Sequence, residues 1–103
     1  MVSVWVMTTG FDDFEAAIRT GVVTGTFRLS GHILTYEFEG ITFRRCRIVE
    51  GDFSGSAFKK CRFEDVVFAQ SKLMNVTFDR SRFECLALEN TTVGAFYARP
   101  PDE

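Results

Sequence analysis

Hydrophobic residues recur at every fifth position over most of this chain, a period that belongs to neither regular secondary structure. Every fifth residue from 38 to 93 is apolar, and most of these residues are phenylalanine. An α-helix repeats near 3.6 residues and a β-strand near 2, so neither element explains the pattern. The series is Phe38, Phe43, Ile48, Phe53, Phe58, Phe63, Phe68, Leu73, Phe78, Phe83, Leu88 and Val93.

A second position in each group of five is also restricted. Two residues before each member of the series, the residue is small or apolar, as at Cys46, Gly51, Ser56, Cys61 and Val66. Every charged residue between 38 and 97 falls on the other three positions. The pattern therefore predicts two inward-facing and three outward-facing positions in every five residues.

A square solenoid satisfies this pattern. If five residues form one side, four sides make a turn of twenty residues, and successive turns stack at the inter-strand distance of ~4.8 Å. Residues twenty apart then lie above one another, and each backbone group can pair with the next turn. The predicted ladders are Phe43–Phe63–Phe83, Phe38–Phe58–Phe78, Ile48–Phe68–Leu88 and Phe53–Leu73–Val93.

Several of these units resemble a known repeat. The sequence "GDFSG" at 51–55 is similar to the loose consensus of the pentapeptide-repeat family, which is a small residue, Asp or Asn, Leu or Phe, a polar residue, and Gly or another residue. "CRFED" (61–65), "VTFDR" (76–80) and "SRFEC" (81–85) have the same form. The resemblance covers roughly residues 36–97. It implies a mainly β fold, the family's right-handed quadrilateral β-helix, with about three coils. Because members of the family bind varied partners, it implies less about function.

The residues before the repeats predict a small α+β cap. "VSVWVM" (2–7) alternates as a strand does, and "FDDFEAAIRTG" (11–21) is typical of a short helix with an acidic first turn. Residues 22–30 and 32–39 are expected to form a hairpin that leads into the first coil. The five-residue pattern is lost in this segment, because position 28, which would continue the series, is Arg and the large apolar residue is Phe27 instead.

The expected organisation is thus one compact domain in three parts. Residues 1–35 form the N-terminal strand, helix and hairpin cap, residues 36–97 form the β-helix, and residues 98–103 form a C-terminal tail. Pro100 and Pro101 cannot continue a β ladder.

Two aromatic residues are expected to close the C-terminal end of the column. Phe96 and Tyr97 follow the last repeat, and no sequence for a capping helix comes after them. They could mediate an end-to-end homodimer or simply plug the end of a monomer, and the sequence does not distinguish these two alternatives.

Composition and charge exclude several classes of protein. The net charge of −2 divides into −3 over residues 1–40 and +1 over residues 41–103, so neither half is a nucleic-acid-binding basic patch. No apolar run approaches the ~20 residues that span a membrane, and residues 1–7 lack the basic start of a secretory signal. Three cysteines in unrelated contexts are typical of reduced thiols in the cytoplasm.

The residue inventory does not favour catalysis. His32 is the one histidine, so a Ser-His-Asp or Cys-His arrangement would depend on a residue of the predicted hairpin. Cys46 and Cys61 occupy inward positions without metal-type spacing, and Cys85 is outward. We expect a protein that is not an enzyme and requires no cofactor or metal.

Function is therefore expected to lie in the outer surface. On the side centred on residues 48, 68 and 88, Val49 and Val67 suggest an apolar stripe, edged by Glu50 and Glu89, that would suit a protein partner. The preference of Val for any strand explains the same residues equally well.

The family resemblance suggests one specific role. Several pentapeptide-repeat proteins resemble duplex DNA and inhibit DNA-handling enzymes such as type II topoisomerases. By this resemblance the chain would be a non-enzymatic inhibitor in the bacterial cytoplasm, for instance an anti-CRISPR protein. It would bind a DNA-binding enzyme or effector complex, and not nucleic acid or a membrane. The carboxylates that could mimic phosphates are Glu37, Glu39, Glu50, Asp52, Glu64, Asp65, Glu84 and Glu89.

A DNA mimic should present one acidic face, whereas these carboxylates alternate with Arg and Lys. The alternative is a structural or scaffolding module for protein–protein interaction or dimerisation.

Overall fold

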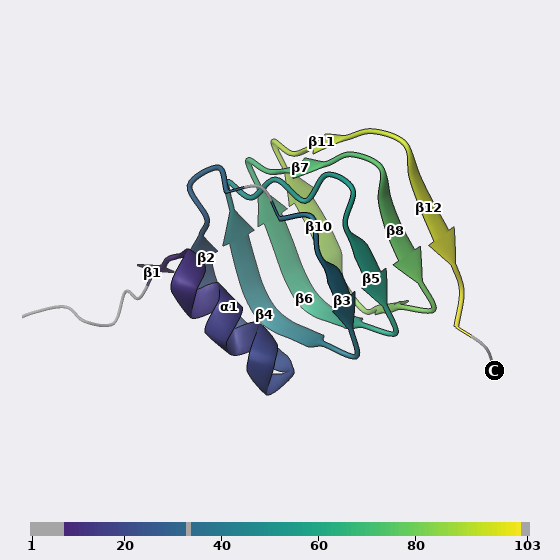
Figure 1. Ribbon diagram of the computed structural model, residues 1–103, viewed down its shortest axis with the longest axis horizontal. Helices are drawn as coiled ribbons and strands as arrows, with labels where there is room; N and C mark the ends of the chain where they lie inside the picture. The colour runs from purple at the N-terminus through teal and green to yellow at the C-terminus, as the bar shows by residue number, and fades with distance from the viewer. Residues whose placement is uncertain (1–7, 33, 102–103) are drawn as a thin grey trace, which may run out of the picture.

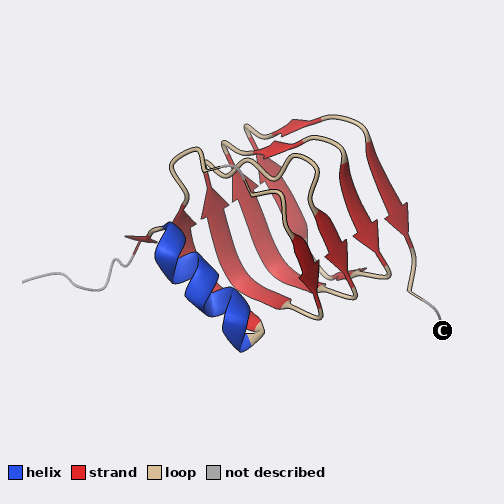
Figure 2. Cartoon of the chain, viewed as in Figure 1, coloured by secondary structure: helices blue, strands red, loops and turns tan. Residues whose placement is uncertain are grey.

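The chain folds into a mostly β solenoid of about four turns, with one short helix against its first turn (Figures 1 and 2). The structure, a computed structural model, describes residues 8–32 and 34–101. In chain order the elements are β1 (Thr8–Thr9), α1 (Phe11–Thr20), β2 (Val22–Arg28), β3 (Glu37–Glu39), β4 (Thr42–Val49), β5 (Ala57–Lys59), β6 (Arg62–Ala69), β7 (Lys72–Leu73), β8 (Val76–Asp79), β9 (Arg82–Phe83), β10 (Leu86–Glu89), β11 (Thr92–Val93) and β12 (Phe96–Arg99).

Successive turns are related by twenty residues, as predicted, and all strand pairs are parallel. Phe43 of β4 lies opposite Phe63 of β6, which lies opposite Phe83 of β9. β3, β5, β8 and β12 form a second sheet, and β7 pairs with β11. The long strands β4 and β6 run around a corner, so one sheet covers two sides of the solenoid (Figure 1). The twenty-residue register is thus confirmed.

The phenylalanine rings stack at nearly the spacing of the strands. Centroids lie 4.7 Å apart between Phe38 and Phe58 and 5.0 Å apart between Phe43 and Phe63, with planes within 11° of parallel. Rings on adjacent sides meet edge to face, as Phe58 and Phe63 do at 5.4 Å and 71°. These are the two arrangements that the ring quadrupole favours. The core is therefore a column of aromatic contacts along and across the turns.

The predicted hairpin of residues 22–30 and 32–39 is wrong, because this segment forms the first turn of the solenoid. β2 pairs in parallel with β4, and Val23 lies opposite Phe43. The register shifts by one residue between Val23 and Gly25, which places Phe27 opposite Ile48. This one-residue shift interrupts the five-residue pattern and hides the first turn in the sequence.

Pairing with neighbouring turns extends beyond the predicted repeat body at both ends. It begins at Val22 in β2 and continues to Arg99 in β12. Parts of the segments predicted as cap and tail therefore belong to stacked turns, which gives about four turns where three were expected.

The corners of the turns use left-handed backbone at every fifth residue. An L residue pays about 1–2 kcal/mol for this conformation, and β-branched residues tolerate it least. The corner residues are polar or glycine, apart from Cys85, and none is β-branched. Positive φ occurs at Gly40, Arg45, Glu50, Gly55, Lys60, Asp65, Gln70, Asn75, Arg80, Cys85 and Asn90.

Hydroxyl groups at inward positions join one turn to the next. Ser81 Oγ donates to the carbonyl of Phe58 (3.0 Å) and accepts the N–H of Cys61 (3.1 Å). Thr91 Oγ1 makes the equivalent bond to the carbonyl of Phe68 (2.9 Å). These small inward residues therefore also satisfy buried backbone groups at the corners, a role that the hydrophobic pattern does not identify.

The helix α1 covers the N-terminal end of the aromatic column. Its helical residues agree with the predicted span, and Gly21 ends it with φ 89° and an N–H bond to the carbonyl of Ile18. Phe14 is fully buried and packs edge to face on Phe27, Phe38 and Phe53. The strand predicted at 2–7 lies outside the described residues.

A charge in the column should unfold the protein. Phe63→Asp removes a fully buried ring, a loss of about 3–5 kcal/mol, and adds a buried carboxylate, so the variant should show no cooperative thermal transition by circular dichroism. Glu64→Lys changes the next, outward-facing residue and should keep the transition with a small loss. Equal melting temperatures for the two variants would contradict the register.

The inward hydroxyls should contribute measurably to stability. Ser81→Ala leaves the Cys61 N–H and the Phe58 carbonyl without this partner, and should cost about 1–3 kcal/mol in urea denaturation. Ser81→Cys should cost less, because Cys61 occupies the same position one turn earlier and its Sγ contacts the carbonyl of Phe38 at 3.4 Å. An Ala variant as stable as the parent protein would show that the bond contributes nothing.

Candidate functional site

Ion pairs between turns cover much of the outer surface. Arg44 Nε lies 2.9 Å from Glu64 on the next turn, and Arg99 Nε lies 2.7 Å from Asp79. The guanidinium groups of Arg44 and Arg62 hold the pKa of Glu64 below its usual range, and Arg99 does the same to the pKa of Asp79. The twenty-residue register thus pairs opposite charges as well as rings.

Most of the carboxylates predicted as phosphate mimics take part in such contacts. The pairs are Glu37–Lys59 (2.6 Å), Glu50–Arg28 (3.0 Å), Glu64–Arg44 (2.9 Å), Glu84–Arg62 (3.8 Å) and Glu89–Arg47 (2.7 Å).

The other three predicted carboxylates differ from these. Asp52 accepts bonds from the hydroxyl and N–H of Ser54, which lower its pKa. Glu39 and Asp65 are exposed, Asp65 at a corner. Negative and positive groups therefore alternate over the sides that carry the predicted residues.

The apolar stripe predicted around Val49 and Val67 is largely covered. Val49 is only 7% exposed, and Val67 is half-buried. Val49 lines a shallow groove of about 160 Å³ together with the long side chains of Arg28, Arg47 and Gln70. These side chains can cover apolar surface with their stems, which leaves little of the stripe open to a partner.

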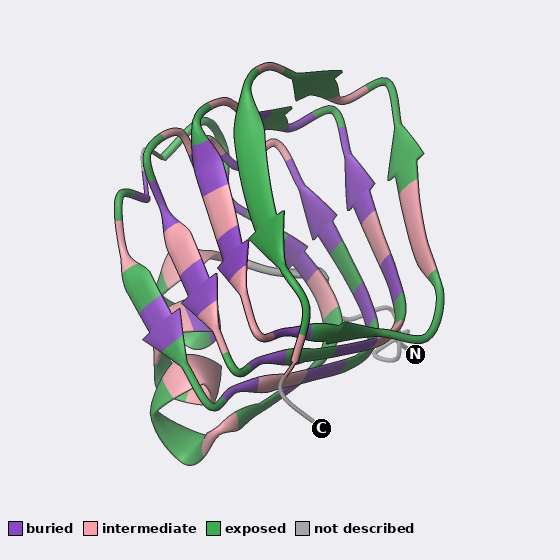
Figure 3. Ribbon diagram, turned by 90° about the vertical axis from the view of Figure 1, so that its right-hand side faces the viewer, coloured by how far each residue is buried: buried purple, intermediate pink, exposed green. Residues whose placement is uncertain are grey.

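The C-terminal end of the column is open. Phe83 is 44% exposed, Leu88 46%, Val93 41% and Phe96 51%. Together with Leu86 and other apolar residues they line a hollow of about 470 Å³. Figure 3 faces this end and shows the last turn almost entirely exposed. The described residues thus present one apolar surface, at the end opposite α1.

The edges of four strands border this surface. β10, β11 and β12 are the last strands of the three sheets, and β9 pairs with β6 alone among the described strands. Unpaired N–H and C=O groups at such edges are available for pairing with another chain.

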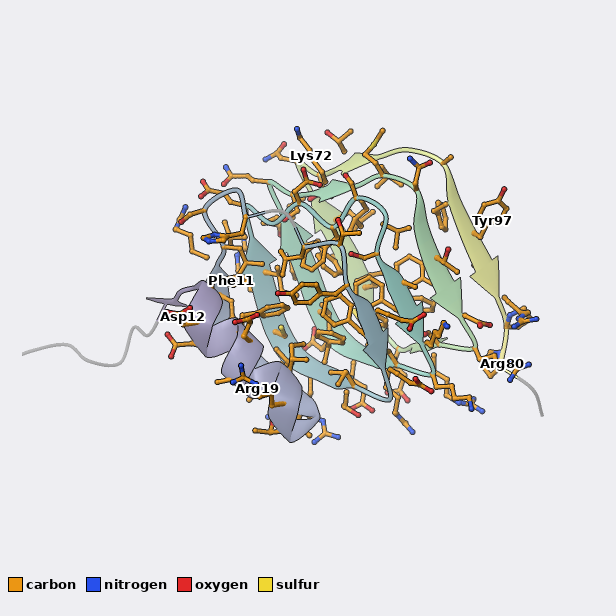
Figure 4. The ribbon with its side chains drawn as sticks, viewed as in Figure 1. Phe11, Asp12, Arg19, Lys72, Arg80 and Tyr97 are labelled. Atoms are coloured by element: carbon orange, nitrogen blue, oxygen red, sulfur yellow. The ribbon has the colours of Figure 1, made fainter. Side chains whose placement is uncertain are left out.

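Phe96 and Tyr97 differ in how they relate to the column. Phe96 packs edge to face on Phe78, with centroids 6.1 Å apart. Tyr97 pairs with Thr77 and is 75% exposed, projecting away from the column (Figure 4). Neighbouring residues of a strand point to opposite faces, so the prediction that both residues close the column is wrong for Tyr97.

The exposed members of the other ladders are site residues that the sequence pattern does not identify. Phe83, Leu88 and Val93 continue the five-residue series, and the series assigns them to the interior. Each is the last member of its ladder and so has no residue of a further turn stacked on it. The position at the end of a ladder is the sequence signal that could have identified this exposed surface.

The histidine and the three cysteines lie in different environments. His32 is exposed, stacks on Phe11 with centroids 4.4 Å apart, and has Nδ1 2.6 Å from the carbonyl of Leu29. Cys46 and Cys61 are buried, and burial raises the pKa of Cys46 to about 12, whereas Cys85 is exposed. No group of three or more His, Cys, Asp and Glu within residues 8–32 and 34–101 could hold a metal ion.

Comparisons with known proteins give no family for the chain. No family model matches it, and no curated protein matches it either. Within the described residues, no helix is long and apolar enough to cross a membrane.

Proposed function

We propose that the protein is a non-enzymatic protein-binding module of the pentapeptide-repeat type, which forms a homodimer through the open end of its solenoid. The observation that carries this proposal is the half-exposed apolar group at that end, Phe83, Leu88, Val93 and Phe96. Exposed apolar surface bordered by polar residues is typical of a protein contact.

A second copy is the partner that fits this end best. The open edges of β9 to β12 lie on the sides of a square turn, and another copy presents a turn of the same size and shape. A two-fold axis across the solenoid would bring the two ends together and pair edge strands between copies. The rim residues Arg82, Glu84, Glu89 and Arg99 carry both signs of charge, so two identical rims need not repel each other.

The assembly should stop at two copies. α1 packs across the first turn, where Phe14 is buried on the aromatic column, so that end does not offer the same apolar surface. An isologous contact that uses one end only is closed and does not produce a filament.

Charge at the open end should separate the two copies. Phe96→Glu places a carboxylate in the apolar interface and should convert a dimer into a monomer in light scattering after size exclusion at micromolar concentration. Val22→Glu makes the same change at an apolar residue that is 44% exposed on the first turn, and should leave the dimer intact. A monomeric parent protein, or loss of the dimer in both variants, would contradict the proposal.

The second candidate function is inhibition of a bacterial DNA-handling enzyme. It is supported by the carboxylates that recur on successive turns, such as Glu64 and Glu84 on one side. The cations that contact most of them reduce the resemblance to a phosphate backbone, and for this reason the dimeric binding module is preferred.

Competition with DNA distinguishes these roles. An inhibitor of this kind should capture a DNA-binding enzyme from a bacterial lysate, and duplex DNA should displace it in proportion to concentration. Glu39→Gln/Asp65→Asn should weaken such a complex, whereas it should not affect the homodimer. A captured partner that DNA does not displace would eliminate the mimic.

A further inference from the structure

One strand of the first turn lacks a neighbour on one side. β3 begins the sheet that continues through β5, β8 and β12, and no described strand pairs with its other side (Figure 1). On another side of the same turn, β2 pairs with β1 through Thr26 and Phe27. Among the described residues, β3 is therefore left unpaired on the side that faces the N-terminal end, and this side is called the β3 edge.

The backbone pairing shows which groups face the β3 edge. The N–H of Ala57 bonds the carbonyl of Tyr36. Alternate residues of a β-strand direct their N–H and C=O groups to the same neighbour, so the groups of Tyr36 and Phe38 face β5. Those of Glu37 and Glu39 therefore point to the β3 edge, where they can pair with a further strand.

The charges beside the β3 edge favour a basic strand. Glu39, Lys59, Asp79 and Arg99 lie opposite one another on successive turns, so the sign of the charge alternates along this ladder. Glu39, the first of them, is exposed and forms no ion pair with any described residue. Glu37, the other outward residue of β3, contacts Lys59 at 2.6 Å. A strand added here would continue the alternation with Lys or Arg next to Glu39.

The inward side of the β3 edge leaves little room. α1 covers the end of the column, where Phe14 is fully buried and packs on Phe38. The hydroxyl of Tyr36 donates to Glu15 of α1 at 2.8 Å. Side chains of an added strand that point inward would therefore have to be small, as the inward serines of the later turns are.

We propose that the β3 edge binds an extended basic segment of a protein partner, which adds a strand to the sheet. Pairing with the backbone of Glu37 and Glu39 provides affinity, and the alternation of Lys or Arg with small residues provides specificity. Residues 1–40 carry a net charge of −3, which favours the approach of a basic segment and disfavours nucleic acid. This surface lies at the end opposite the proposed dimer contact and does not depend on it.

Binding of a short peptide tests the β3 edge. The probe is a fluorescein-labelled peptide in which lysine alternates with threonine, and its anisotropy should rise and saturate as the full-length protein is added at low ionic strength. A peptide of the same composition with its lysines contiguous should bind at least about tenfold more weakly, because its lysines cannot all point outward. A peptide of alternating glutamate and threonine should not bind.

Protein variants separate the contribution of charge from that of backbone pairing. Glu37→Gln/Glu39→Gln should weaken binding of the lysine–threonine peptide by at least about fivefold. Glu39→Pro also removes an N–H that points to the β3 edge, so it should weaken binding more than Glu39→Gln while retaining the cooperative thermal transition. Glu50→Gln/Glu89→Gln removes two carboxylates from another side of the solenoid and should bind as the parent does.

Amide hydrogen exchange locates the bound peptide. The N–H groups of Glu37 and Glu39 should become protected, whereas that of Ala98 at the opposite end should not change. Phe96→Glu should bind the peptide as the parent does, so failure of the dimer proposal would leave this one standing.

Three results would overturn the proposal. They are no saturable binding of the lysine–threonine peptide, equal binding of the peptide with contiguous lysines, or unchanged affinity in both Glu37→Gln/Glu39→Gln and Glu39→Pro. A parent protein whose mass in light scattering falls in Glu37→Gln/Glu39→Gln would assign the β3 edge to a second copy of the chain instead.

Discussion

The match between two distances holds this structure together. Backbone hydrogen bonds between parallel strands set a separation of ~4.8 Å, and the stacked phenylalanine rings lie 4.7–5.2 Å apart. The same twenty-residue step therefore satisfies backbone pairing and ring stacking together. A shift of a single residue at Phe63 would lose the ring stacking, since it would move Phe63 from the column to the surface and bring a charged neighbour inside.

The surface follows from the same constraint. Each outward residue lies above the residue twenty positions earlier. The charges of these two residues therefore determine whether neighbouring turns attract or repel each other at that point. Arg44 over Glu64 and Asp79 below Arg99 are attractive pairs. Such exposed pairs contribute little individually, but together they leave a surface of alternating sign.

The sequence was informative wherever the period was unbroken. From Phe38 to Val93 the spacing alone predicted which residues stack, and the corner positions within this range are polar or glycine residues, apart from Cys85. The first turn could not be predicted, because the register shift between Val23 and Gly25 moves its apolar residues out of phase. The burial of Val49 could not be predicted for another reason: it lines a groove with the long side chains of Arg28 and Gln70, and a five-residue pattern does not report how such side chains lie.

The two ends of the solenoid show why a repeat pattern is a poor guide to function. Phe63 and Phe83 occupy the same position of the repeat, yet Phe63 is fully buried and Phe83 is 44% exposed. What differs is the presence of a further turn, and at the first turn α1 and Phe14 take that place. A residue that stabilises the fold in one turn can thus become a contact residue in the last one. The open end is consequently the part of the surface where the apolar residues of the repeat itself are exposed.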